Sequence, residues 1–101
     1  MNTQANQAIT LVATIEIKPE HTEQAKSELL KLTKASQAET GCIQYNLHQD
    51  NANPNNFVTY EVWENQELME QHGQSEHFQN FVKVTKDMID NFVITEMTFI
   101  A

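Results

Sequence analysis

Apolar residues occupy every second position near the start of the chain. Over residues 9–18, one side of the alternation collects Ile9, Leu11, Ala13, Ile15 and Ile17. A period of two is typical of a strand with one buried face. A strand is predicted here, and it must stop by Pro19, which has no backbone N–H for a ladder.

The period then changes to that of a helix. Over residues 22–39, Ala25, Leu29 and Leu32 recur on one side, and Gly41 supplies a natural stop. Alternation returns over 42–48, where Ile43, Tyr45 and Leu47 are predicted to share a face, and again over 57–64. Because residues 50–56 are rich in Asn with one Pro, these two strands are predicted to form a hairpin with a long loop.

The last third of the chain predicts two helices and a strand. Asn65 can cap a short helix that carries His72 and is interrupted at Gly73, and Ser75 can cap a longer one. The apolar face predicted for that longer helix consists of Phe78, Phe81, Val82, Thr85, Met88 and Ile89. Residues 92–100 are predicted to form the final strand.

The predicted order, β-α-β-β-α-β, is the ferredoxin-like α+β arrangement, with a four-stranded antiparallel sheet and helices on one face. The final strand is apolar on both faces, so each face must be buried against another part of the protein or a partner. Helices supply one cover, and a second copy of the chain is the simplest other one. We expect a homodimer packed sheet to sheet, with residues 1–8 as a flexible tail and 9–101 as a single domain.

Composition narrows the choice of partners. The chain has 101 residues and a formal net charge of -8, from 6 Lys+Arg against 14 Asp+Glu. This charge disfavours nucleic acids and anionic membranes, both of which need cationic contacts. Cys42 is the only cysteine, so an intrachain disulfide is excluded, and a cytoplasmic location fits best. Neither a secretory signal nor a membrane span is evident.

Candidate chemistry gathers between residues 61 and 78. His72 is the candidate general base, because histidine titrates near neutral pH, and His77 is a second, weaker candidate for the same cleft. Glu61 is unusual as a carboxylate within a strand; it could orient a histidine, polarise a substrate or pair with a lysine. The candidate substrate contacts are Trp63, Tyr45, Tyr60, Glu61, His77 and Phe78, with core packing as the alternative for the aromatic ones. No metal site is predicted, since zinc-like ligand spacing is missing, and no nucleotide motif is present.

Four segments together resemble one known family. They are residues 16–20, 39–45, 61–64 and 72–78, and they occur in the order found in the antibiotic biosynthesis monooxygenase domain family. The resemblance is nearest to its small quinol monooxygenase-like branch. It implies a dimeric α+β barrel with a cleft between helices and sheet in each subunit. It also implies oxygenation of a small aromatic or quinol by dioxygen without any cofactor, with His72 in the place of the family's pocket histidine.

Other branches of the family leave alternatives open. In the haem-degrading branch an asparagine, a tryptophan and an axial histidine stand where this chain has Ala13, His72 and Val82, so haem chemistry is not expected. A second branch isomerises a small phosphorylated signalling metabolite and shares the histidine at 72. Lysine is the only basic side chain here besides histidine, which weakens phosphate binding without excluding it. A non-catalytic ligand-binding module is the third alternative.

Overall fold

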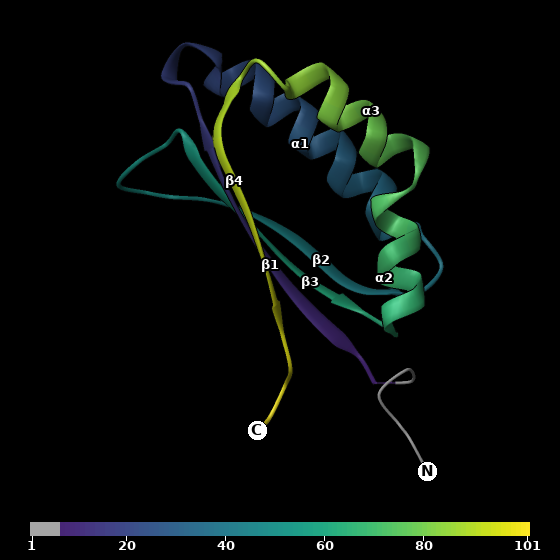
Figure 1. Ribbon diagram of the computed structural model, residues 1–101. Helices are drawn as coiled ribbons and strands as arrows, with labels where there is room; N and C mark the ends of the chain where they lie inside the picture. The colour runs from purple at the N-terminus through teal and green to yellow at the C-terminus, as the bar shows by residue number, and fades with distance from the viewer. Residues whose placement is uncertain (1–6) are drawn as a thin grey trace.

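The computed structural model describes residues 7–101, so most of the predicted tail, 1–8, lies outside the described residues. The elements follow the predicted order (Figure 1). They are β1 (Ile9–Ile17), a 3₁₀ turn η2 (Pro19–His21), α1 (Thr22–Gln37), β2 (Cys42–Gln49), β3 (Asn56–Trp63), α2 (Gln66–Gly73), α3 (Glu76–Thr85) and β4 (Ile89–Met97). The ferredoxin-like α+β prediction is confirmed.

The four strands form one antiparallel sheet in the order β2-β3-β1-β4. Helices α1 and α3 lie side by side over one face of this sheet, and α2 lies near the ends of β2 and β3 (Figure 1). Register places Ala13 between Thr59 of β3 and Ile94 of β4, so all three face the helices. The alternation in β1 therefore points its apolar side into the core, where Ile15 and Ile17 are almost completely buried.

Both predicted caps are present. The side chain of Asn65 accepts a hydrogen bond from the backbone N–H of Leu68, and the Ser75 hydroxyl accepts one from the N–H of Phe78. These caps satisfy backbone donors that a helix start leaves unpaired. Because the two caps are ten residues apart, α2 is short and its last turn holds His72 directly before α3 begins.

The boundary between α3 and β4 was predicted wrongly. The helix ends at Thr85, and Ile89, which was assigned to its apolar face, already pairs with Ile17 in the sheet. Burial against β1 outweighs the helical spacing of Met88 and Ile89. The strand also ends earlier than predicted, at Met97, whose partner is Thr10 near the start of β1. Beyond Thr10 only one residue of β1 remains, Ile9, which pairs with Trp63 of β3.

Ile43 was also misplaced. A register shift between Cys42 and Gln44 inserts one extra residue, Ile43, that has no partner in β3. This bulge turns Cys42 toward a small core cluster around Trp63 and leaves Ile43 exposed. Tyr45 keeps its predicted inward direction and is buried, while Leu47 packs against the main core.

Candidate functional site

A cleft of about 240 Å³ opens between the helices and the sheet. Its floor is the helix-facing side of the sheet, including Leu11 and Ala13 of β1, and its roof includes His72 of α2 and Phe81 of α3. Most of the lining is apolar. The charged side chains in the lining are three carboxylates, Glu61, Glu70 and Glu96. A cleft of this kind suits a small, largely apolar and uncharged ligand.

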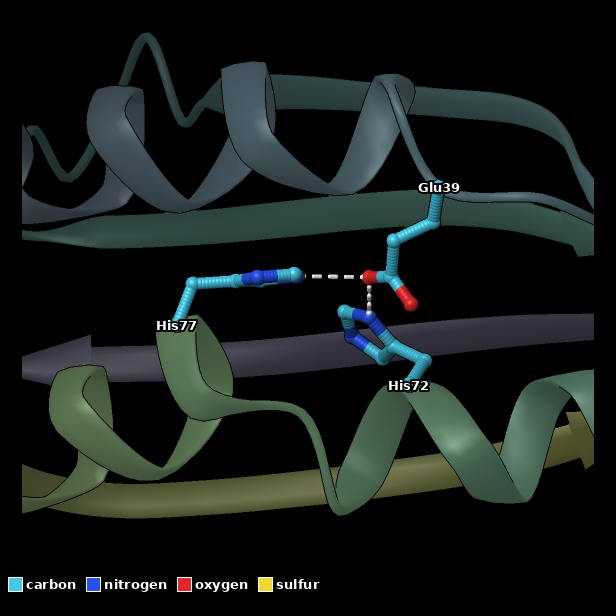
Figure 2. A group of neighbouring side chains, drawn as sticks. All are labelled: Glu39, His72 and His77. Carbon is cyan, nitrogen blue, oxygen red and sulfur yellow. Dashed lines mark hydrogen bonds and ion pairs between the residues drawn. The ribbon is translucent and has the colours of Figure 1, made fainter.

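His72 is held by a carboxylate from a distant part of the chain. Its Nδ1 lies 2.6 Å from Oε2 of Glu39, in the turn after α1. The same oxygen lies 2.6 Å from Nε2 of His77, in the first turn of α3. Figure 2 shows the two imidazoles approaching this carboxylate from two helices. The predicted helix over 22–39 ends at Gln37, so Glu39 is free to reach the histidines.

Glu39 determines which tautomer the neutral His72 ring adopts. An ionised carboxylate only accepts hydrogen bonds, so Nδ1 of His72 must donate its N–H to Glu39. In the neutral imidazole the other nitrogen, Nε2, then carries a lone pair. No group within residues 7–101 makes a hydrogen bond to that nitrogen, and the ring lines the cleft. The arrangement therefore presents a proton acceptor to whatever occupies the cleft.

Aromatic rings hold the imidazole in place. The Trp63 ring lies 4.6 Å from it at an interplanar angle of 32°, and Phe78 and Tyr45 lie 5.3 and 5.7 Å away. Tyr45 and Phe78 line the cleft, and their role as substrate contacts stays a prediction. Trp63 is completely buried and does not line the cleft, so it supports His72 from behind.

The Glu61 carboxylate hydrogen-bonds to neighbouring side chains of its own strand and not to a histidine. Its carboxylate is buried, lines the cleft, and accepts hydrogen bonds from the Thr59 hydroxyl (2.8 Å) and the Trp63 indole N–H (3.0 Å). These two donors satisfy one oxygen each, which stabilises a buried carboxylate without a lysine partner. The carboxylate that orients the histidine is Glu39, not Glu61.

Two other candidate contacts lie outside the cleft. Tyr60 points to the opposite face of the sheet, since its neighbours Thr59 and Glu61 both face the helices. His77 lines a separate hollow with Lys31 and Asn80. It hydrogen-bonds to Glu39, and its ring centroid lies 6.0 Å from that of His72. Glu39 itself was not foreseen as a site residue, nor were Met69 and Phe92, which also line the cleft.

Two titratable side chains near the site, Tyr45 and Cys42, resist deprotonation. Burial raises the pKa of the Tyr45 hydroxyl well above its usual value, and the nearby Glu61 carboxylate raises it further. Burial also raises the pKa of the Cys42 thiol, with added effects from Glu39 and Glu61. Tyr45 is therefore a neutral hydrogen-bonding group, and Cys42 is a poor nucleophile at neutral pH.

Glu39, His72 and His77 are also the one group of described side chains that could hold a metal ion, since their donor atoms lie within 4.8 Å of one another. Two imidazoles and a carboxylate are a ligand set that several divalent metals accept. The two 2.6 Å separations, however, are those of short charge-assisted hydrogen bonds. Hydrogen bonding alone accounts for the arrangement.

Comparisons with known proteins agree with this fold. A Bacillus subtilis protein named "Putative monooxygenase YcnE" is 38% identical over 81 residues, covering 80% of this chain and 85% of that protein. The crystal structure of PA3566 from Pseudomonas aeruginosa is 35% identical with a TM-score of 0.91, covering 96% of this chain and 98% of the other. A conserved protein from Methanosarcina mazei is 26% identical with a TM-score of 0.84, covering 97% and 98% of the two chains.

The sequence profile of one family spans most of the chain. It is the profile described as antibiotic biosynthesis monooxygenase, and it matches residues 8–84, from just before β1 to the last turn of α3. That range contains Glu39, His72 and His77. The match confirms the resemblance predicted from the four sequence segments and supports a function of the monooxygenase type. The chain belongs to the antibiotic biosynthesis monooxygenase family.

Proposed function

We propose that the protein is a monooxygenase that inserts one oxygen atom from dioxygen into a small quinol or related aromatic, without metal or organic cofactor. The observation that carries the proposal is the His72 imidazole, buried at an apolar cleft with Nδ1 bonded to Glu39 and Nε2 free. Nε2 takes the proton of a substrate hydroxyl, and the apolar walls exclude water from the reacting ring.

The chemistry balances without an added reductant. His72 removes a hydroxyl proton, and the electron-rich phenolate passes one electron to dioxygen. The two radicals combine at a neighbouring ring carbon to form a C–O bond, and the imidazolium returns its proton to the outer peroxide oxygen. Loss of the proton on that carbon breaks the O–O bond and forms a carbonyl. A quinol and one dioxygen thus become a hydroxyquinone and one water.

A phosphorylated substrate is less well supported by this cleft. Three carboxylates line it and no lysine does, so a phosphate would meet repulsion with no cation to offset it. No cationic side chain in the cleft lining therefore favours the isomerase alternative.

The test is oxygen uptake with a reduced naphthoquinol in the presence of a metal chelator. The wild-type protein should consume oxygen and form hydroxyquinone, and His72→Ala should lower the rate at least about 100-fold. His21→Ala, in the 3₁₀ turn η2 and outside the cleft lining, is the matched control and should keep full activity. Uptake that chelation abolishes would contradict cofactor independence. Undiminished activity in His72→Ala would remove this histidine from the mechanism.

We also propose that the protein acts as a homodimer packed through the uncovered face of its sheet. That face carries Tyr60, Val93 and Met97, which are 39%, 47% and 47% exposed in the single chain. Val12 and Val58 lie on the same face. An apolar sheet face of this kind is typical of a surface that another subunit covers.

A further inference from the structure

A second hollow continues the cleft along α3. This groove, of about 370 Å³, lies between α3 and the edge strand β4. Four residues line both the cleft and the groove, namely Phe78, Phe81, Phe92 and Ile94. The two spaces therefore share one apolar wall, and a ligand in the cleft can extend into the groove without leaving contact with that wall.

The groove differs from the cleft in its polar groups. Its other lining residues are Val82, Thr85, Lys86 and Ile89, and none of them is acidic. The Thr85 hydroxyl already donates to the backbone carbonyl of Phe81, and the alkyl stem of Lys86 can cover apolar surface while its amine stays in water. The groove has no paired set of donors and acceptors for a polar ligand, so hydrocarbon suits it best.

The groove lies on the helix side of the sheet, and the proposed dimer contact is on the opposite face. A partner subunit packed on that opposite face leaves the groove open. Val82 and Ile94 stand 44% and 52% exposed along it, which is apolar surface that a ligand could remove from water.

We propose that the substrate is an amphiphilic quinol with an uncharged alkyl or similar hydrocarbon chain. The aromatic head lies in the cleft with a hydroxyl at His72, and the chain passes over Phe78 and Phe81 into the groove between α3 and β4. This inference rests on the proposed function for the identity of the head group. The chain contributes binding through burial, at about a fourfold gain in affinity for each methylene removed from water.

Binding can be measured apart from turnover. Oxidised naphthoquinones lack the electrons to reduce dioxygen, and Trp63, the only tryptophan, packs against the cleft histidine, His72. Quenching of its fluorescence should give Kd for quinones bearing methyl, propyl, pentyl and heptyl chains. In the wild-type protein Kd should fall by roughly fourfold per methylene until the groove is filled.

Two variants locate the chain. Val82→Asp puts a charge in the groove, and Val84→Asp makes the same change on the same helix at a residue that lines neither space. Their exposed fractions, 44% and 40%, are matched, so neither change should unfold the protein. Val82→Asp should flatten the dependence on chain length and leave the methyl compound unaffected, whereas Val84→Asp should behave as wild type.

The outcomes separate the two proposals. No dependence on chain length in the wild type, or an undiminished dependence in Val82→Asp, would overturn the amphiphile inference even if the methyl quinol is oxygenated. Chain-dependent Kd values that Val82→Asp abolishes support the inference even if no quinol turns over, and in that case the oxygenase proposal is the one that fails.

Discussion

At the scale of single residues, the site depends on a carboxylate that the cleft does not contain. Glu39 holds the N–H of His72 Nδ1 and thereby keeps the lone pair on Nε2. A buried imidazole without such a partner could adopt the other tautomer, in which Nε2 carries the proton and cannot act as a base. The ability of His72 Nε2 to accept a proton is therefore expected to depend on the hydrogen bond from Nδ1 to Glu39.

Glu39→Gln tests this dependence. The amide can donate its own N–H to Nδ1, which moves the ring proton to Nε2, so kcat should fall on the order of 100-fold or more with a smaller change in KM. Steady-state oxygen uptake at several quinol concentrations gives both constants. The control is Glu70→Gln, which removes a carboxylate from the cleft lining but leaves the His72 contact intact. An equal loss in both variants would point to the overall charge of the cleft rather than to the tautomer.

Tyr45 gives a prediction for alkaline pH. Because its pKa is raised by burial and by Glu61, the folded chain holds the hydroxyl proton more tightly than the unfolded chain. The stability it contributes is complete below about pH 10, the ordinary tyrosine pKa, and declines as pH rises further. Urea unfolding between pH 8 and about pH 11 should show a decline of up to about 1.4 kcal/mol per pH unit from this group. Tyr45→Phe should lack that component and Tyr60→Phe should keep it; identical curves for Tyr45→Phe and wild type would refute the assignment.

At the scale of elements, the turn after α1 connects fold and site. Gly41 has a φ of +90°, a backbone conformation that residues with a side chain rarely adopt. A Cβ at this position would lie 2.5 Å from Cδ1 of Leu68 in α2. The turn therefore permits α2 to pack close to the segment that carries Glu39. This close approach places His72 within hydrogen-bonding distance of Glu39.

The two glycines of the chain make a matched pair for measuring this effect. Gly41→Ala should lower the free energy of unfolding by about 2 kcal/mol or more, through backbone strain and displacement of Leu68. Gly73→Ala, where a Cβ would meet nothing within 4 Å, should stay within about 1 kcal/mol of wild type. Urea unfolding curves give both values. Equal stability of the two variants would show that the Gly41 turn is not a constraint.

Sequence periodicity predicted these elements well where local signals agreed. The caps at Asn65 and Ser75 and the alternation of β1 each have a short-range cause, and each is confirmed. The error at Ile89 arose because its helical spacing and its burial against β1 point to different structures. The bulge at Ile43 depends on pairing with β3, which the local pattern does not contain.

At the scale of the whole molecule, tertiary folding assembles the site from segments far apart in sequence. His72 and His77 are 33 and 38 residues from Glu39. The histidines were recognisable as candidates because of their chemistry, but no sequence spacing indicated which carboxylate would meet them. No helix in the described chain is long and apolar enough to cross a membrane.

The proposed dimer is testable at this scale. Light scattering after size-exclusion chromatography should give twice the chain mass of 11.6 kDa for the wild-type protein. Val93→Asp places a charge on the uncovered sheet face and should yield monomers, because burying an unpaired carboxylate opposes association. Leu30→Asp, at a 54% exposed position of α1, is the control and should remain dimeric. A wild-type monomer at micromolar concentration would rule out the dimer.

The most direct test of the central proposal is the fate of isotopically labelled dioxygen. Wild-type protein, a naphthoquinol and ¹⁸O₂ should give, with chelator present, a hydroxyquinone that carries one labelled oxygen by mass spectrometry, and His72→Ala should give almost none. Spontaneous oxidation instead yields unlabelled quinone and hydrogen peroxide. If the wild-type protein forms only these two products, at the rate seen without protein, it does not oxygenate the quinol.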